Sequence, residues 1–410
     1  MPFQTPEYAG KEKPQNVVSS FFRTTILSAG VLCGLAFLPA ATYFTPVKSL
    51  LFFMVGLFVL FGCEKVLGQG GDSTRAYFID ARFHTGKILD HIPTDYSTVR
   101  SPFMAELDFS ILKNEQRVWD YANCYAKNGL ALSYIDFGDA GLLGKAAGLT
   151  IFTEPYVVHS QRFLFTFRAG AGLSYLTKLY NADSNPENIY FSQHISFLLL
   201  LNPTLYYVIH PRWRILGGVQ FTHISNGGST WPNWGINIVT ANVGVSYAVR
   251  PLELKPRTRK AFTERSLKVI THLFGGSHTS DPTDTEPSKK RFAGGVNVGV
   301  VKPLGRVCSI GLGTEFFYDG VSNVLEAQNN KPYNTFVASV SLQNYFFFGK
   351  ILFGQQLAYY VSPHHPNPDN NLYQHYLLEY RITGPLYAGI SLHAHGKVSD
   401  FLALTAGVIF

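Results

Sequence analysis

The chain has 410 residues, of which 46% are hydrophobic, 15% aromatic and only 15% charged. Soluble domains carry roughly 25% charged residues, and disordered chains are far less apolar. The composition therefore excludes a disordered or low-complexity protein, and a mean hydropathy of +0.06 disfavours a bundle of membrane helices. It is typical of a membrane β-barrel, in which lipid-facing and lumen-facing residues average out.

The net charge of +7 does not indicate nucleic-acid binding, because the basic residues are scattered and match no binding motif. Basic side chains also suit the phosphates of an anionic lipid surface, which is the partner we expect. The four cysteines form no CxxC pair and have no spacing typical of a zinc site.

The N-terminal region contains two apolar runs. Lys48, the apolar core 50–61 and the small residues at 68–70 are typical of a secretory signal peptide, which we assign to residues 47–70. Residues 1–46 are an uncertain extension with two interpretations. Either translation starts at Val47, or residues 21–44 are a membrane anchor, which would favour an inner-membrane protein with a periplasmic β domain.

From residue 76 onward the polarity of the sequence alternates with a period of two. In 162–176 the odd positions are apolar, from Phe163 to Tyr175, whereas the even positions are mostly small or polar. This alternation is expected of a strand with one face toward lipid and the other toward a lumen. It predicts strands near 77–88, 101–112, 128–138, 145–155, 161–176, 190–209, 212–225, 235–249, 265–276, 291–303, 306–319, 335–348, 351–363, 372–382, 385–396 and 400–410.

The parity of the strands supports this number. Bacterial barrels have an even number of strands, with short periplasmic turns and longer outer loops. Counting back from the last strand makes 303–305 a periplasmic turn, and counting forward does the same for 210–212. The two counts agree only if one outward strand lies between them in 250–290, so we include the weak strand 265–276.

The predicted fold is an all-β transmembrane antiparallel barrel of about 16 strands, within a range of 12–16, after an N-terminal signal segment. The first half of the barrel, 71–250, carries the candidate site. A connecting segment, 251–290, holds the weak strand, and 291–410 form the second half. The closing amphipathic strand ends at Phe410 and is similar to the insertion signal of outer-membrane proteins, which indicates the bacterial outer membrane.

The segment 221–237 carries the most informative polar residues. His223 and Ser225 continue the apolar, lipid-facing series of one strand, and Asn237 belongs to the same series of the next strand. Polar groups that face hydrocarbon are costly unless they pair with one another. Residues two apart on a strand share a face, so the imidazole of His223 is expected to reach the Ser225 hydroxyl.

This combination of side chains suits nucleophilic catalysis. A histidine acts as general base, a serine as nucleophile, and a third polar group fixes the imidazole tautomer. A site that opens sideways into the membrane suits a lipid substrate, and the chemistry requires no metal and no cofactor. The plainer interpretation is a histidine at the membrane interface, a turn serine and Asn-Gly loop chemistry.

The motif His223-x-Ser225-Asn226, followed by Pro232-Asn233 and a polar residue at 237, resembles the PagL-type lipid A 3-O-deacylases. Larger acyloxyacyl hydrolase-related relatives resemble the chain in 134–138, 143–146 and 395–410. The resemblance implies His223 as base and Ser225 as nucleophile of an esterase acting on lipid A of lipopolysaccharide. It implies oxyanion donors among Asn226, the amide of Gly228 and Asn233. The family has a glutamate where this chain has Asn237.

The resemblance leaves two functions open. In the first, Asn237 orients His223 and the chain is a carboxylic ester hydrolase. In the second, the chain is a non-catalytic barrel, a porin or structural protein, that retains a degenerate motif, since about sixteen strands would leave room for an aqueous lumen.

Other polar residues are expected to be structural. The histidines His364 and His365 lie in an outer loop, and His393 and His395 belong to the lumen-facing series. The acidic residues Asp136, Glu315 and Asp319 are interpreted as ordinary barrel carboxylates.

Overall fold

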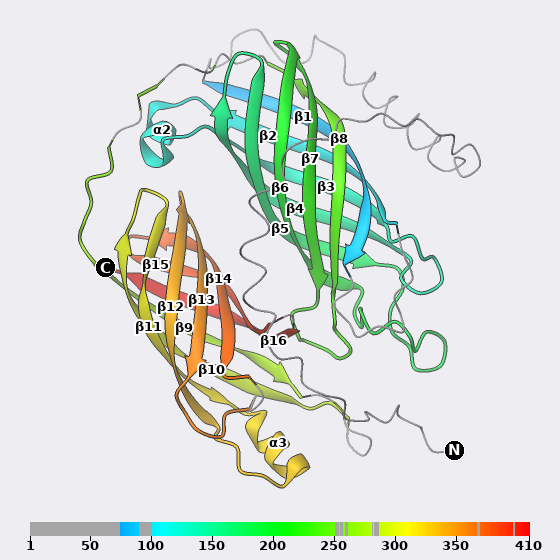
Figure 1. The fold of residues 1–410 in the computed structure, drawn as a ribbon, viewed down its shortest axis with the longest axis vertical. Coiled ribbons are helices and arrows are strands. Elements are labelled where there is room, and N and C mark those ends of the chain that lie inside the picture. The colour runs from blue at the N-terminus through cyan, green and yellow to red at the C-terminus, as the bar shows by residue number, and fades with distance from the viewer. Residues whose placement is uncertain are drawn as a thin grey trace, which may run out of the picture. The chain divides into compact units, whose positions relative to one another are not determined.

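The computed structural model describes residues 74–89, 101–250, 254, 257–258, 261–280, 282, 287–366, 370–396 and 398–410. The predicted extension 1–46 and signal peptide 47–70 lie outside these residues. The described part forms two closed barrels (Figure 1). Each is built from antiparallel strands that follow one another in chain order.

The first barrel contains eight of the described strands. They are β1 (Arg75–Leu89), β2 (Phe103–Lys113), β3 (Ala126–Asp136), β4 (Lys145–His159), β5 (Phe163–Leu176), β6 (Ile195–His210), β7 (Trp213–Ser225) and β8 (Ile236–Ala248). Each strand pairs with the next, and β8 pairs back to β1, with Phe78 opposite Ala248 and Leu89 opposite Asn237.

The second barrel contains the other eight described strands. They are β9 (Lys268–Thr279), β10 (Lys290–Pro303), β11 (Cys308–Asp319), β12 (Phe336–Phe348), β13 (Ile351–Tyr360), β14 (Leu372–Thr383), β15 (Leu386–His395) and β16 (Val398–Ile409). The last strand, β16, pairs with β9, so this sheet also closes on itself.

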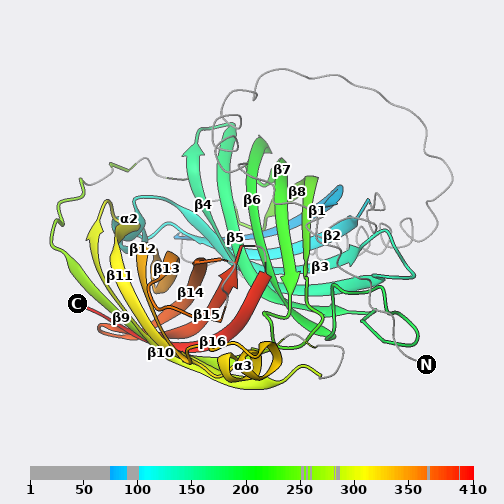
Figure 2. The same ribbon diagram turned by 60° about the horizontal axis from the view of Figure 1, so that its bottom comes forward.

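In the described part of the chain, two short helices lie in connections between strands. One is α2 (Gln116–Ala122) between β2 and β3, and the other is α3 (Ser322–Asn329) between β11 and β12, which is drawn clearly in Figure 2. Both end at an asparagine in the left-handed conformation, Asn123 and Asn330, which accepts such backbone angles more readily than most residues do.

Among the described residues, no helix is long and apolar enough to cross a membrane.

The sequence prediction of sixteen antiparallel strands is confirmed, and the weakest of them, 265–276, corresponds to β9. The closure differs from the single barrel that we expected. Strand alternation specifies which face of a strand is buried, but it does not specify which strand pairs with the first one. Here β8 and β16 each return to the start of their own sheet, which yields two barrels of eight strands among the described residues.

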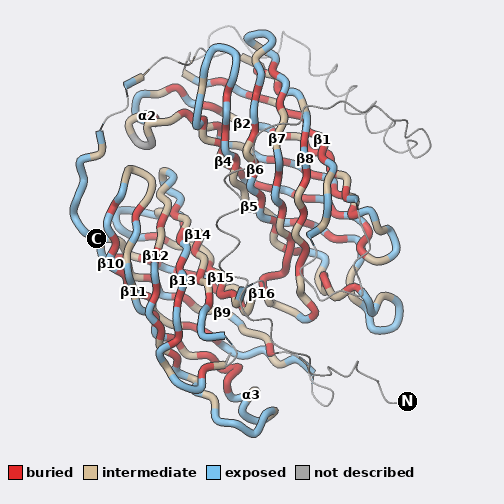
Figure 3. Tube along the Cα trace, viewed as in Figure 1, coloured by how far each residue is buried: buried red, intermediate tan, exposed pale blue. Residues whose placement is uncertain are grey.

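This closure removes the expected wide lumen. Eight strands enclose an interior that is just wide enough to be filled by side chains. Along the strands, buried and exposed residues alternate, as Figure 3 shows. In β5, Leu164 and Thr166 are buried, whereas Phe163, Phe165 and Phe167 are exposed. The exposed apolar faces are those that a membrane barrel presents to lipid.

The interior of the first barrel has three layers. An apolar cluster that includes Phe78, Leu112 and Tyr206 lies toward the end where β1 begins. A second apolar cluster, including Leu198 and Ile224, lies toward the opposite end. The inward-facing residues between these clusters are charged or polar and are also buried, for example Arg82 on β1, Asn202 on β6 and Gln220 on β7.

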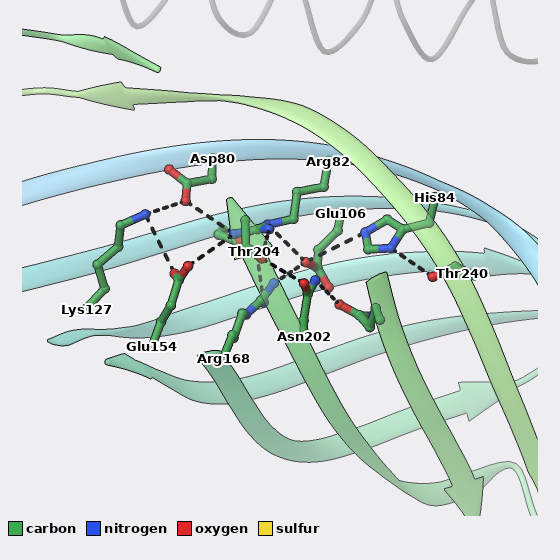
Figure 4. A network of polar contacts seen from close by, with 12 residues as sticks. Asp80, Arg82, His84, Glu106, Lys127, Glu154, Arg168, Asn202, Thr204 and Thr240 are labelled. Atoms are coloured by element: carbon green, nitrogen blue, oxygen red, sulfur yellow. Dashed lines mark hydrogen bonds and ion pairs between the residues drawn. The ribbon is translucent and has the colours of Figure 1, made fainter. Parts of the chain in front are cut away.

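The middle layer is a network of buried charges, drawn in Figure 4. Arg168 donates to Glu106 at 2.5 Å and to Asp108 at 3.1 Å. Arg82 donates to Asp108 at 3.0 Å, and Lys127 donates to the carboxylate of Asp80 at 2.8 Å. Because buried charges are stable only when paired, the network holds the wall of the barrel together while it fills the lumen.

Candidate functional site

Three polar side chains from β7 and β8 form a hydrogen-bonded row at the end of the first barrel that carries its longer loops. His223 Nδ1 lies 2.7 Å from Asn237 Oδ1, and His223 Nε2 lies 2.9 Å from Ser225 Oγ. These are the three residues that the sequence predicted to lie together.

The strand register explains the geometry. His223 lies directly opposite Asn237 in the β7–β8 ladder, so their side chains project from the same face. Ser225 lies two residues further along β7 and therefore also shares that face. The row is thus fixed by the backbone hydrogen bonds between two adjacent strands, at the end of β7 and the start of β8.

The two hydrogen bonds specify one protonation pattern. An amide oxygen can only accept, so with Asn237 Oδ1 facing the ring, His223 Nδ1 carries the proton and donates it. His223 Nε2 then has a lone pair and accepts the hydroxyl proton of Ser225. A neutral imidazole in this tautomer is what removal of a proton from Ser225 requires.

The row lies on the outer face of the barrel, as the alternation predicted, but it is less exposed than expected. Phe221, two residues before His223 on β7, is exposed, whereas His223 and Asn237 are half-buried. Ser225 is only 5% exposed, and Gly235 of the loop that follows β7 lies close against its Cβ.

The loop between β7 and β8 is organised by Asn226. Its backbone N–H donates to Asn233 Oδ1 at 2.9 Å, and its Nδ2 donates to the carbonyl oxygen of Thr230 at 2.9 Å. Its Oδ1 accepts the backbone N–H of Ser229 at 3.1 Å. Gly228, in the same loop, has a φ of +78°, which glycine adopts without strain. These bonds fix the loop directly beyond Ser225.

A second segment supports the loop, and the sequence analysis did not identify it. Ser192, between β5 and β6, accepts a hydrogen bond from Asn226 Nδ2 at 3.0 Å. The carbonyl oxygen of Tyr190 accepts the backbone N–H of Gly235 at 3.2 Å. Tyr190 and Phe191 are buried in the apolar cluster beneath the site. No local motif predicts this contact, because it depends on the conformations of the two loops that precede β6 and follow β7.

Gly235 makes the closest backbone approach to the row. It has a φ of +62°, and a Cβ placed on it would lie 2.9 Å from both the Ser225 Cβ and the Ile224 carbonyl oxygen. The same Cβ would lie 3.4 Å from His223 Cε1. Glycine is therefore needed here for two independent reasons, the left-handed backbone and the lack of space.

The remaining polar residues named from the sequence lie elsewhere in the molecule. His364 and His365 lie in the connection after β13, and His395 Nδ1 contacts Asp400 at 2.5 Å. Asp136 accepts the backbone N–H of Gly138, and Asp319 accepts that of Val321, so both stabilise turns. Glu315 and His393 contact each other in the second barrel, at 2.9 Å.

Two family models match separate parts of the chain. Residues 106–246 match the family described as lipid A 3-O-deacylase (PagL). Residues 267–410 match the family described as acyloxyacyl hydrolase, C-terminal domain. The first match covers β7, β8 and the row, and the second covers the second barrel.

Among solved structures, the chain is similar to the outer membrane enzyme PagL, with 13% identity and a TM-score of 0.31 over 40% of this chain and 97% of that one. It is also similar to the translocator domain of the autotransporter NalP from Neisseria meningitidis, with 9% identity and a TM-score of 0.21 over 90% and 99%. A triple mutant of the Rhodopseudomonas blastica porin has 8% identity and a TM-score of 0.18 over 82% and 100%. No curated protein matches the chain.

Proposed function

We propose that this chain is an outer-membrane esterase that removes an ester-linked acyl chain from lipid A, since residues 106–246 match the lipid A 3-O-deacylase family and residues 267–410 match the acyloxyacyl hydrolase C-terminal family. The observation that carries the proposal is the row in which His223 contacts Ser225 at 2.9 Å and Asn237 at 2.7 Å.

In the proposed mechanism Ser225 is the nucleophile. Its Oγ attacks the ester carbonyl carbon while the hydroxyl proton moves to His223 Nε2. The tetrahedral intermediate then expels the sugar oxygen, which takes the proton from His223. Water then attacks the acyl-Ser225 ester while His223 accepts its proton, and the second tetrahedral intermediate expels Ser225 Oγ, which takes that proton back as the free fatty acid leaves. Asn237 keeps the imidazole in the required tautomer throughout.

The oxyanion of the intermediate requires N–H donors close to Ser225. Our candidates remain the Asn233 side chain, the backbone amide of Gly228 and Asn226. The bond from the Asn226 backbone N–H to Asn233 Oδ1 occupies that oxygen and leaves Asn233 Nδ2 as the donor, whose present partner is Ser399 Oγ at 3.4 Å. An oxyanion would have to replace that long bond. The side chain of Asn226 is engaged within the loop, which supports a positioning role for this residue rather than direct contact with substrate.

The surroundings of the row suit an acyl chain. Leu199 lies opposite His223 on β6 and is 44% exposed, and Phe221 precedes His223 on the same face at 37% exposed. Both project from the outer wall of the barrel, where lipid acyl chains lie. A substrate of this kind reaches Ser225 from within the membrane, with its sugar headgroup toward the loops.

Mass spectrometry of lipid A after incubation of lipopolysaccharide with the purified protein tests the proposal. The unmodified protein should remove the mass of one hydroxyacyl chain, and Ser225→Ala should leave lipid A intact. Intact lipid A in both reactions, with both proteins folded by circular dichroism, would contradict it.

The second candidate is a non-catalytic barrel. A porin would need an open lumen, whereas Arg82, Lys127 and Arg168 lie fully buried among carboxylates inside the first barrel. Single-channel recording in planar bilayers separates the two functions, because the esterase predicts a silent barrel and a porin predicts stable open-channel steps.

A further inference from the structure

The second barrel has a buried cluster of potential metal ligands that the proposed esterase reaction does not use. Glu315 on β11 contacts His375 on β14, with 2.6 Å between Oε2 and Nδ1, and His393 on β15, with 2.9 Å between Oε1 and Nε2. All three side chains are at most 2% exposed. Because β11 and β14 are separated by two strands in the sheet, Glu315 reaches across the lumen to the histidines.

We propose that Glu315, His375 and His393 form a binding site for a single divalent transition-metal ion, with Zn²⁺ as the best match. One potential ligand atom from each residue lies within 4.8 Å of the others. Tetrahedral zinc, with bonds of about 2.0–2.1 Å, needs ligand atoms roughly 3.3 Å apart, so the side chains need only small shifts. Two imidazoles and a carboxylate form a ligand set that zinc favours, with water as the fourth ligand.

The charge balance of the second barrel supports a cation here. In the first barrel, arginine and lysine side chains neutralise the buried carboxylates. Among the described residues of the second barrel, Glu315, Asp319 and Glu379 are buried, but no lysine or arginine is buried with them. Each of these carboxylates contacts histidines instead, which are cations only when protonated. A divalent ion held by Glu315 and its two neutral histidines would neutralise this buried carboxylate.

The hydrogen bonding of the histidines points the same way. One nitrogen of each imidazole lies at hydrogen-bond distance from a carboxylate oxygen of Glu315. The other nitrogens, His375 Nε2 and His393 Nδ1, are buried without a hydrogen-bond partner among the described residues. When a metal takes the nitrogens that face Glu315, each neutral ring moves its proton to the other nitrogen, so no proton is lost. Only small outward movement of the rings is needed to admit the ion.

Neighbouring hydroxyl groups fix the carboxylate. Tyr373 donates its hydroxyl proton to Glu315 Oε1 at 2.8 Å, and the Tyr373 oxygen lies 2.7 Å from Ser339 Oγ. Partners of this kind orient metal ligands, and their loss typically weakens metal binding about 10- to 100-fold. Tyr373 is therefore a positioning residue for the proposed site.

A stack of rings leads from this site to a cavity at the end of the barrel. Tyr373 stacks on Tyr360 with ring centroids 4.6 Å apart, and Tyr360 stacks on His365 at 4.1 Å. Tyr360 and His365 line a cavity of about 360 Å³. The packed rings of Tyr373 and Tyr360 separate the proposed site from this cavity, so an ion entering from there requires both rings to turn aside. An entry path is a requirement for a buried metal site.

The test uses the untagged full chain, stripped with a chelator, incubated with Zn²⁺ and separated from free metal before elemental analysis. Wild type should retain one zinc per chain. Glu315→Gln, His375→Gln and His393→Gln should each lose at least about 100-fold in affinity, since a ligand counts for more than the outer partners above. Co²⁺ in place of zinc should give the intense visible absorption of a four-coordinate site in wild type alone.

His272→Gln is the matched control. His272 is also a buried histidine beside a buried glutamate, with 3.0 Å between its Nδ1 and Glu379 Oε1, but no third potential metal ligand joins this pair among the residues that the structure describes. This variant should keep the zinc. If a ligand variant does not fold, Tyr373→Phe, which leaves all three ligands in place, should still weaken binding about tenfold. Wild type without bound zinc, or zinc retained equally by folded ligand variants, would overturn the proposal.

Discussion

His223 Nδ1 and Asn237 Oδ1 face each other across the β7–β8 ladder at 2.7 Å, in direct register. A glutamate would supply a negative charge at this position, whereas the asparagine supplies only a hydrogen-bond acceptor. The pair therefore retains the orientation of the imidazole and its tautomer but loses electrostatic stabilisation of the imidazolium that forms when Ser225 is deprotonated.

The first prediction concerns this missing charge. Asn237→Asp keeps the size and shape of the side chain and adds a carboxylate, so its hydrogen bond to His223 becomes charge-assisted. Such bonds contribute about 1.5–3 kcal/mol, against roughly 1 kcal/mol for a neutral bond, and a gain of about 1–2 kcal/mol in the transition state would raise kcat roughly 5- to 30-fold. Initial rates of fatty acid release from lipopolysaccharide measure it.

Asn237→Leu is the companion variant, because it removes the acceptor without adding a charge. It should lower activity well below that of the unmodified protein. Equal rates for the Asp, Leu and unmodified proteins would show that residue 237 does not act on His223.

The second prediction concerns the close approach of Gly235. Gly235→Ala adds a Cβ 2.9 Å from the Ser225 Cβ and strains a backbone with a φ of +62°. The displacement of Ser225 from His223 should lower kcat about 100-fold, since a shift of 1 Å can have that effect. The same deacylation rates measure it, with circular dichroism to monitor folding.

Gly349→Ala provides the control for backbone strain alone. Gly349 has a φ of +69°, but its Cβ would meet no atom within 4 Å, and it lies in the turn between β12 and β13. This variant should retain full activity. Comparable losses in the two variants would assign the effect to general strain rather than to crowding of the site.

The third prediction concerns the charge network of the first barrel. Arg168→Met removes a cation that pairs with Glu106 and Asp108. Both carboxylates are buried inside the barrel, so they lose part of their pairing where water cannot replace it. Breaking a buried ion pair from one side typically lowers the free energy of unfolding by about 3–5 kcal/mol. Urea unfolding of the protein in lipid vesicles should show this loss.

Lys145→Met is the control for removing a positive charge at the surface. Lys145 lies 3.7 Å from Asp136, and both side chains are about a third or more exposed, so this pair is screened by solvent. Its removal should leave the unfolding curve unchanged. Similar shifts in the two variants would mean that the buried network does not hold the barrel together.

The strands and the row could be predicted because both depend on local periodicity. Alternation in residues such as Phe163 to Tyr175 fixes which face is buried, and the spacing of His223 and Ser225 fixes a shared face. Barrel closure could not be predicted, because the pairing of β8 with β1 joins residues far apart in the chain. The contact of Glu315 with His375 crosses the lumen, depends on closure and was missed for that reason. The hydrogen bond from Asn226 to Ser192 was missed because it depends on the conformations of two loops.

The burial of Ser225 is a second feature that local periodicity could not predict. Its place in the outward series predicted exposure to lipid, and the β7–β8 loop covers it instead. Side-chain hydrogen bonds such as those of Asn226 set this loop conformation. The periodicity of the sequence does not predict such bonds.

Covalent labelling tests most directly whether Ser225 is a nucleophile activated by His223. A fluorophosphonate with a long alkyl chain reacts when the serine Oγ displaces fluoride at phosphorus, while the base takes the hydroxyl proton. Peptide mass spectrometry should find the alkylphosphonyl group on Ser225 in the unmodified protein and in Asn237→Asp. Ser225→Ala and His223→Gln should remain unlabelled. An unlabelled Ser225 in folded, unmodified protein, or equal labelling of Ser225 after His223→Gln, would contradict the account.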